Sequence, residues 1–347
     1  MDFQHTLLSW YKVHKRNLPW RHTTDSYIIW LSEIILQQTR VDQGTPYFLK
    51  FLEAFPTVID FANAEESAIL KLWQGLGYYS RARNMHATAK RVANDYNGAF
   101  PTSYKELLGL RGIGPYSAAA ISSFSTGAKQ AVVDGNVFRV LARYFGVQSA
   151  INSPKGVKEF NALAAELLFL QDPGLYNQAI MEFGALQCKA KNPNCGVCPL
   201  NRGCFALNSD AVAKLPVKLP KAAKKMRYFN YLICIANGQI LVRYRQSGDI
   251  WQHLFDFPSI DTQEPSEGLQ PEFVQASVAL LGPQINLNLK ATLKHVLTHQ
   301  LITAQFFLVD HFLIELSKLP NCKWVSLQEL EELPQPKLIN NFIEKVL

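Results

Sequence analysis

Four of the six cysteines in this chain of 347 residues lie within one seventeen-residue stretch, CKAKNPNCGVCPLNRGC. Thiols crowded in this way favour one metal centre over disulfides, because an intracellular protein keeps its cysteines reduced. Four thiolates suit a tetrahedral zinc ion as well as an iron-sulfur cluster, so the spacing C-x6-C-x2-C-x5-C leaves both open. The four candidate ligands are Cys188, Cys195, Cys198 and Cys204.

The hydrophobic pattern divides the chain into a helical part and a later part rich in strands. The first two hundred residues repeat apolar positions with a period of about 3.6, interrupted by Gly, Pro and Asn, which predicts helices with short connections. Asn237-Gly238, between two β-rich runs, is a strong hairpin signal, and Cys234 and Cys322 are expected to pack within apolar strands. The predicted segments are helices at 27–36, 64–73, 104–110, 116–124, 136–145, 157–170 and 270–281, a basic linker at 211–227, and β-rich runs at 228–245 and 303–316.

The charge is distributed unevenly between these two parts. Residues 1–227 carry 27 Lys and Arg against 16 Asp and Glu, a net +11, whereas residues 228–347 carry 8 against 12, a net −4. A polyanionic partner is therefore expected to contact mainly the first part. A basic surface that merely keeps the protein solvated explains the same charge equally well.

Residues 110–120, LRGIGPYSAAA, place a glycine-rich turn between two predicted helices. Gly112 and Gly114 leave backbone N–H groups accessible, and these groups, with the dipole of the following helix, suit a phosphate. Glycines in such a turn are often only helix caps. Asp134 begins another predicted helix, where an acid is most often an N-cap, but beside a phosphate-binding turn its carboxylate can face a sugar carbon.

This turn, the Asp134 segment and the four cysteines together resemble the helix-hairpin-helix DNA glycosylases of the endonuclease III superfamily, most closely the adenine DNA glycosylases of the MutY type. The resemblance implies an all-α N-terminal region, a six-helix barrel plus an iron-sulfur lobe, and an α+β Nudix-like C-terminal domain. The implied domains are residues 1–208, with the hairpin at about 108–120 and a 4Fe-4S loop at 188–204, a basic linker at 209–227, and residues 228–347. It favours the 4Fe-4S cluster over zinc.

The resemblance also assigns the catalytic residues. Relatives that nick the strand carry a lysine at the position of Tyr116, and because tyrosine cannot form a Schiff base, a monofunctional glycosylase is expected. Glu33, in SYIIWLSEIILQQTRV, matches the general acid that protonates adenine, although a glutamate on a helix is more often exposed. Asp134 matches the carboxylate that stabilises the oxocarbenium ion or forms a transient bond to the sugar, and Asn136 is expected to orient groups beside it.

Further matches predict contacts to DNA and to the extruded base. For Trp20 and Tyr78 the alternative is ordinary core packing, and for Arg21 and Glu182 it is a surface ion pair. Trp20, Arg21 and Glu182 are expected to line the adenine pocket. The residues expected at the backbone or the minor groove are Gln37, Gln38, Thr39, Leu76, Tyr78, Gly112, Gly114 and Ser117.

The C-terminal part resembles the Nudix-like domain that reads the base opposite the adenine. The stretch GDIWQHLFDFPSI, residues 248–260, resembles a signature of that domain, but the acidic Nudix box is absent, so no pyrophosphatase activity is expected. Where the family has Phe-Ser-His, this chain has Leu297-Thr298-His299, which keeps the hydroxyl and loses an aromatic ring. Without the resemblance, His295 and His299 would be ordinary histidines at a strand edge.

The expected activity is removal of adenine opposite 8-oxoguanine or guanine in double-stranded DNA by a monomeric enzyme. Two alternatives are a pyrimidine or thymine-mismatch glycosylase of the same superfamily and a non-enzymatic iron-sulfur DNA-binding protein. The sequence shows neither the pattern of a signal peptide nor the ~20 apolar residues of a membrane span. We therefore expect a soluble protein without a membrane partner, cytoplasmic and associated with the nucleoid through DNA in a bacterium, nuclear in a eukaryote.

Overall fold

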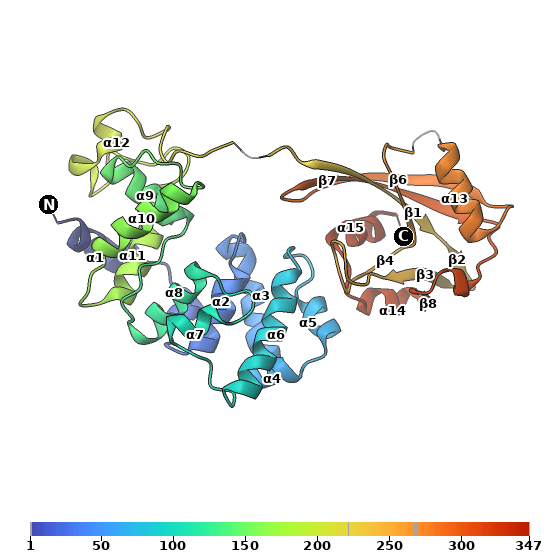
Figure 1. The fold of residues 1–347 in the computed structure, drawn as a ribbon, viewed down its shortest axis with the longest axis horizontal. Helices are drawn as coiled ribbons and strands as arrows, with labels where there is room; N and C mark the ends of the chain where they lie inside the picture. Colours follow the sequence, from blue (N-terminus) through green and yellow to red (C-terminus); the bar gives the residue numbers. More distant parts are fainter. Residues whose placement is uncertain (1, 221, 267–268, 347) are drawn as a thin grey trace. The chain divides into compact units, whose positions relative to one another are not determined.

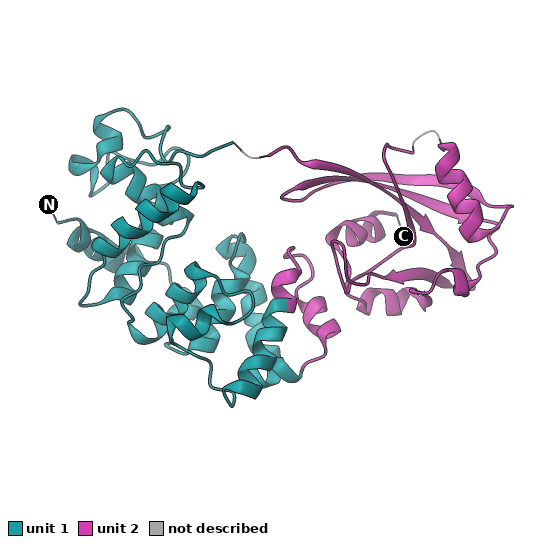
Figure 2. Cartoon of the chain, viewed as in Figure 1, with its two compact units in different colours: residues 1–63, 84–220 teal, residues 64–83, 221–347 magenta. Residues whose placement is uncertain are grey.

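The computed structural model describes residues 2–220, 222–266 and 269–346 and contains two compact units (Figures 1 and 2). Unit 1 comprises Met1–Asn63 and Asn84–Pro220, and unit 2 comprises Ala64–Arg83 and Lys221–Leu347. The predicted boundaries assign residues 64–83 to the helical region, whereas their contacts group them with the C-terminal part.

Unit 1 is built from helices, as predicted. Each predicted helix forms, with ends that shift by up to a few residues: the helix predicted at 157–170 begins earlier because Ser153 caps it through the N–H of Gly156, and it ends at Glu166. Within the described residues, no helix combines the length and the apolar character needed to cross a membrane. The helices are α1 (Phe3–His14), η1 (Pro19–Arg21), α2 (Ser26–Ile35), α3 (Val41–Ala54), α4 (Val58–Asn63), α6 (Ser80–Asp95, whose first residues belong to unit 2), α7 (Tyr104–Leu108), α8 (Pro115–Thr126), α9 (Gly135–Phe145), α10 (Pro154–Glu166), α11 (Pro173–Leu186), η2 (Asn201–Gly203) and α12 (Phe205–Asn208).

Two groups of buried side chains hold unit 1 together. In one, α11 packs against α1 and α9, and fully buried Phe160 of α10 joins the same core. In the other, the rings of Trp30 and Phe51 contact Phe61 in an aromatic cluster beside the α2–α8 contact. Because α11 also contacts α8, the contact between these two helices joins the two groups of buried side chains.

The segment predicted as a linker is attached to unit 1 over much of its length. The guanidinium of Arg143 donates to the carbonyl oxygen of Leu215 at 3.0 Å, and the N–H of Ile151 donates to that of Val217 at 3.0 Å. Leu215 is itself buried in the core of unit 1. The first strand of unit 2 begins at Lys225.

Unit 2 combines two sheets with helices, which confirms the predicted α+β class. One sheet has the order β5-β1-β7-β6, with β1 and β7 parallel, and the other has the order β2-β3-β4 with β8 paired to β3. The predicted turn at Asn237-Gly238 joins β2 to β3, with φ of +52° and +74°. The elements are α5 (Glu66–Leu72), β1 (Lys225–Ile233), β2 (Ile235–Ala236), β3 (Gln239–Tyr244), β4 (Phe255–Asp256), β5 (Ser259–Thr262), α13 (Pro271–Leu281), β6 (Asn286–Val296), β7 (Gln300–Asp310), η3 (Leu316–Lys318), β8 (Cys322–Ser326), α14 (Leu327–Glu332) and α15 (Lys337–Val346).

The core of unit 2 contains both remaining cysteines, as predicted. Cys234 is fully buried beside Phe273 and Phe307, and half-buried Cys322 packs against the same cluster. The run predicted at 303–316 forms a strand only as far as Asp310. Both cysteines therefore pack in the core of unit 2 and are not part of the cysteine-rich loop.

Polar groups join residues 64–83 to the rest of unit 2. The side-chain oxygen of Gln74 accepts from the N–H of Gln335 at 3.2 Å, and the hydroxyl of Tyr79 donates to the carbonyl oxygen of Gln335 at 2.9 Å. Lys71 donates to the carbonyl oxygen of Glu331. These bonds attach the helical segment at the end of α14.

Candidate active site and cysteine centre

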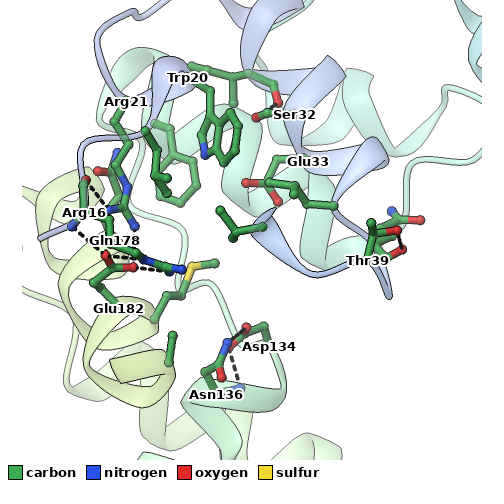
Figure 3. Close-up of a pocket in the computed structure, with 18 of the residues that line it drawn as sticks. Arg16, Trp20, Arg21, Ser32, Glu33, Thr39, Asp134, Asn136, Gln178 and Glu182 are labelled. Carbon is green, nitrogen blue, oxygen red and sulfur yellow. Dashed lines mark hydrogen bonds and ion pairs between the residues drawn. The ribbon is translucent and has the colours of Figure 1, made fainter. Parts of the chain in front are cut away.

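A cavity of about 220 Å³ in unit 1 collects most of the predicted catalytic and base-binding side chains. They come from η1, α2 and the turn after it, α8, α9 and α11, so the cavity lies where the two groups of packed helices meet. Figure 3 shows Glu33, Asp134 and the Arg21–Glu182 pair on three sides of this cavity. The predicted residues that line it are Trp20, Arg21, Glu33, Gln37, Thr39, Tyr116, Asp134, Asn136 and Glu182.

Glu33 lies on α2 among apolar side chains and is only 9% exposed. Burial raises the pKa of Glu33 to about 7, and the negative charge of Asp134 acts in the same direction. A hydrogen bond with Tyr116 and the positive charge of Arg21 oppose this rise in pKa. A carboxyl group with such a pKa can carry a proton at neutral pH and give it up, as a general acid must.

Asp134 is the N-cap of α9 and also faces the cavity, so a helix cap and a carboxylate in the site are compatible at this position. Its carboxylate accepts from the N–H groups of Asn136 and Val137, both at 2.8 Å, and from the side-chain amide of Asn136 at 2.6 Å. Burial raises the pKa of Asp134, and these hydrogen bonds and the charge of Arg139 oppose that rise. The donors at the helix start stabilise the ionised carboxylate.

Tyr116, the second residue of α8, places its phenol among the acidic groups. Burial first, and then the charges of Glu33 and Asp134, raise the pKa of Tyr116 well above its ordinary value. The hydroxyl is therefore neutral and hydrogen bonds with Glu33. No lysine is among the residues that line the cavity in the part of the chain that the structure describes.

Glu182 of α11 forms the opposite wall with two arginines. Its carboxylate, 1% exposed, accepts from Arg16 at 2.9 and 2.7 Å and from Arg21 at 3.0 and 2.8 Å. Burial alone would raise the pKa of Glu182, but the hydrogen bonds from the arginines lower it to about 2. Arg16 was not predicted; its only sequence signal is that it stands five residues before Arg21. The wall thus consists of two ion pairs that share the buried Glu182 carboxylate and line the cavity.

Arg139 connects the N-terminal end of α9, where Asp134 lies, with the cysteine loop. No pattern in the sequence indicates this connection. Its guanidinium donates to the carbonyl oxygen of Cys188 at 2.7 Å, to that of Gly184 at 2.6 Å and to the side-chain oxygen of Asn136 at 2.8 Å. Because Asn136 in turn donates to Asp134, a continuous chain of hydrogen bonds joins the first cysteine to the acid.

The four predicted cysteine ligands line one small hollow, which Arg143 also lines. None of the four is in a disulfide. Within the described residues, no three His, Cys, Asp or Glu side chains converge closely enough to hold a single metal ion. Four cysteine side chains around one hollow are the donor set that an iron-sulfur cluster needs, and a structural zinc ion uses the same set.

The predicted backbone contacts in unit 1 lie at the turn before α8 and at the turn after α2. Gly112 has a left-handed φ of +80°, whereas Gly114 has a φ of −92° and needs no special torsion. The side-chain amide of Gln37 donates to the hydroxyl of Ser117 at 3.1 Å and so ties the turn after α2 to the start of α8. Gln38 also has a left-handed φ, of +57°.

The remaining predicted residues lie in unit 2. Tyr78 is 45% exposed and its hydroxyl hydrogen bonds with that of Thr298, which brings two predicted contact residues together. Leu76 is buried, at 7% exposed, so it does not present its side chain as Tyr78 does. Leu297, Thr298 and His299 form the turn between β6 and β7, closed by the N–H of Leu297 and the carbonyl oxygen of Gln300 at 2.9 Å.

Three family descriptions match separate parts of the chain. Residues 31–166 match the HhH-GPD superfamily base excision DNA repair proteins, residues 188–204 match the iron-sulfur binding domain of endonuclease III, and residues 230–345 match the NUDIX domain. The last match includes the turn of Leu297, Thr298 and His299. The cysteine loop is therefore an iron-sulfur binding loop.

Known proteins resemble the chain over 60% to 99% of its length. Adenine DNA glycosylase of Buchnera aphidicola subsp. Schizaphis graminum is 30% identical over 99% of this chain and 98% of its own. That of subsp. Baizongia pistaciae is 37% identical over 75% of this chain and 74% of its own. Among solved structures, a thermostable thymine-DNA glycosylase is 32% identical, with a TM-score of 0.56 over 60% of this chain and 95% of its own. The two relatives extend into the C-terminal part, and the chain belongs to the adenine DNA glycosylase family.

Proposed function

We propose that the chain, an adenine DNA glycosylase of base excision repair, removes adenine mispaired with 8-oxoguanine or guanine in double-stranded DNA. The observation that carries this proposal is the pair of carboxyl groups, Glu33 and Asp134, in one cavity with different electrostatic surroundings. Burial raises the pKa of Glu33 to about 7, whereas the carboxylate of Asp134 accepts three short hydrogen bonds. Such pairs divide acid and electrostatic work in the cleavage of glycosidic bonds.

In the proposed reaction Glu33 donates its proton to N7 of the extruded adenine, so that the base leaves as a neutral molecule. The bond between the sugar carbon and the base breaks, and the electron pair stays with the base. Asp134 stabilises the positive charge that develops on the sugar. A water molecule then adds to the sugar carbon and gives one proton to the Glu33 carboxylate, which restores the acid. A positioned general acid typically contributes 10²–10⁴-fold, roughly, to such a rate.

The Arg16–Glu182–Arg21 wall gives the pocket its polar edge. Because both arginines hold Glu182 ionised, its carboxylate stays an acceptor at every physiological pH. Trp20, whose ring contacts Phe48 edge to face at a centroid distance of 5.2 Å, supplies an aromatic side wall. We propose that these residues bind adenine after it leaves the duplex.

The product of the proposed reaction is an abasic site in an unbroken strand. Tyr116 stands where a strand-cleaving relative would carry its amine, and its neutral phenol can hydrogen bond but cannot form a Schiff base. We assign to Tyr116 the task of orienting Glu33 beside the sugar.

Recognition of the opposite base is assigned to unit 2. Tyr78 enters the stack beside the mispair, and Thr298, bonded to its hydroxyl, lies next to the same site. Thr298 supplies a hydroxyl for 8-oxoguanine, while Leu297 supplies a smaller apolar contact than a phenylalanine would. The Gly112–Gly114 turn binds the phosphate backbone irrespective of sequence.

The iron-sulfur loop is proposed to hold one 4Fe-4S cluster through its four cysteines. Four cysteine side chains around one hollow fit this group. When bound, the cluster supplies structural order to the loop, and Arg139 transmits that order to Asn136 through its hydrogen bonds. We further propose that the enzyme acts as a monomer, in the cytoplasm of a bacterium or the nucleus of a eukaryote.

The proposal is tested with duplexes that carry adenine opposite 8-oxoguanine, adenine opposite guanine, thymine opposite guanine or an oxidised pyrimidine. Strand cleavage that occurs only at adenine and only after alkali supports it. Cleavage without alkali would refute the monofunctional assignment, and cleavage at thymine would favour the activity named for the solved thymine-DNA glycosylase. Glu33→Gln and Asp134→Asn should bind DNA without turnover, and an absorbance band near ~400 nm together with bound iron is expected from the cluster.

A further inference from the structure

The short loop that carries Tyr78 adopts an unusual backbone conformation. Gly77 and Tyr78 both have left-handed φ values, of +75° and +49°. This region favours glycine, and a bulky residue stays there only when its surroundings hold it. The conformation leaves the Tyr78 ring 45% exposed, while the neighbouring Leu76 is buried.

Two side chains hold this loop at a single carbonyl oxygen. The indole N–H of Trp73, a fully buried residue, donates to the carbonyl oxygen of Gly77 at 2.9 Å. The guanidinium of Arg81, in the first turn of α6, donates to the same oxygen at 3.3 Å. Two donors from different side chains therefore hold the carbonyl oxygen that precedes Tyr78.

Arg81 also contacts the two aromatic rings of the loop. Its guanidinium carbon lies 4.9 Å from the centre of the Trp73 ring and 5.7 Å from the centre of the Tyr78 ring. Burial lowers the pKa of Arg81 to about 10, so the group remains cationic at neutral pH. A planar cation can stack on both rings and hydrogen bond at once, which an ammonium group cannot do.

We propose that Arg81 is a positioning residue for Tyr78: through the Trp73 ring and the carbonyl oxygen of Gly77, it fixes the loop in the conformation that presents the Tyr78 ring to DNA. This inference rests on the proposed role of Tyr78 beside the mispair. Arg81 then restricts the loop to the productive conformation and takes no part in breaking the glycosidic bond.

The test compares Arg81→Ala, Arg81→Lys, Tyr78→Ala and the double variant Arg81→Ala with Tyr78→Ala in the full-length, cluster-containing protein. The control is Lys90→Ala, which removes one positive charge from an exposed position of the same helix. Single-turnover adenine release is measured on duplexes with adenine opposite 8-oxoguanine and with adenine opposite an abasic analogue, where extrusion meets no paired base. Fluorescence of 2-aminopurine at the adenine position reports extrusion directly.

Arg81→Ala should slow release opposite 8-oxoguanine about tenfold, with a matching loss of the extrusion signal, and should change release opposite the abasic analogue much less. Arg81→Lys should recover only part of the rate, and Lys90→Ala should match the wild type. Because Arg81 acts through Tyr78, the double variant should be no slower than Tyr78→Ala.

Independent, multiplicative losses in the double variant would overturn the inference, as would equal losses on both duplexes. A wild-type rate in Tyr78→Ala would overturn it as well, because there would be no wedge to position. Thymine release in place of adenine release would refute the proposed substrate only, since the same comparison of variants then applies to the thymine-guanine duplex.

Discussion

The raised pKa of Glu33 makes a prediction about stability that is separate from catalysis. A carboxyl group whose pKa rises from 4.5 in the unfolded chain to about 7 in the folded protein favours the folded state only while it is protonated. Its contribution is fully present below pH 4.5 and is lost as the pH rises through about 7. Glu33→Gln cannot ionise, so the variant should escape this loss.

The size of the effect follows from the two pKa values. Proton linkage gives Glu33→Gln a stability advantage of about 1 kcal/mol near pH 5.5 and about 3 kcal/mol near pH 8.5. The difference between the two pH values, about 2 kcal/mol, is the informative quantity, because any fixed cost of the amide cancels from it.

Urea unfolding of the full-length protein, followed by the helical circular dichroism signal at both pH values, measures this difference. Glu53→Gln is the matched control: the same chemical change at an exposed position of α3, where the two pH values should give the same result. An equal gain for Glu33→Gln at both pH values would refute the reasoning that burial raises the pKa of Glu33. Under the proposed mechanism, the cavity thus keeps this acid at a cost in stability.

Three further substitutions test other parts of the structure. Gly112→Ala should lower the free energy of unfolding by about 1–3 kcal/mol, because the φ of Gly112 is +80° and an added Cβ would lie 2.8 Å from the Cβ of Asn84. At Gly114 an added Cβ would meet nothing within 4 Å. Equal losses for Gly112→Ala and Gly114→Ala in denaturant titrations would therefore contradict this prediction. Glu182→Gln should lower the free energy of unfolding by about 3–5 kcal/mol at neutral pH. Because the pKa of Glu182 in the folded state is lowered to about 2, this loss of stability should become smaller as the pH falls below 4.5. A loss that stays constant in acid would contradict the ion-pair explanation. Leu297→Phe should raise the ratio of single-turnover rates on 8-oxoguanine and guanine duplexes about 2- to 10-fold, and an unchanged ratio would count against a contact of this residue with the opposite base.

The sequence predicted those features that depend on local pattern or on a distinctive motif. The helices, the Asn237-Gly238 turn and the crowded cysteines each follow from a few neighbouring residues, and the fold class follows from their order. The pairing of Glu33 with Asp134 was reached through the resemblance, because nothing local connects two residues a hundred positions apart.

Other features depend on tertiary contacts that leave no local signal. Arg16 and Arg139 are ordinary basic residues in the sequence, and only their partners, Glu182 and the Cys188 carbonyl, show what they do. The burial of Leu76 next to exposed Tyr78 likewise follows from the three-dimensional course of the loop. The attachment of residues 64–83 to the end of α14 is equally non-local.

That attachment has a consequence for how the chain is made. Gln74 and Gln335 are 261 residues apart, so at ribosomal speeds Gln74 leaves the ribosome about 10–50 s before its partner exists. The hydrogen bonds in question use side chains such as Gln74, Lys71 and Tyr79, which water can satisfy in the meantime. A nascent chain can therefore complete the helices around the cavity of Glu33 and Asp134 first, and acquire the last contacts of residues 64–83 only as synthesis ends.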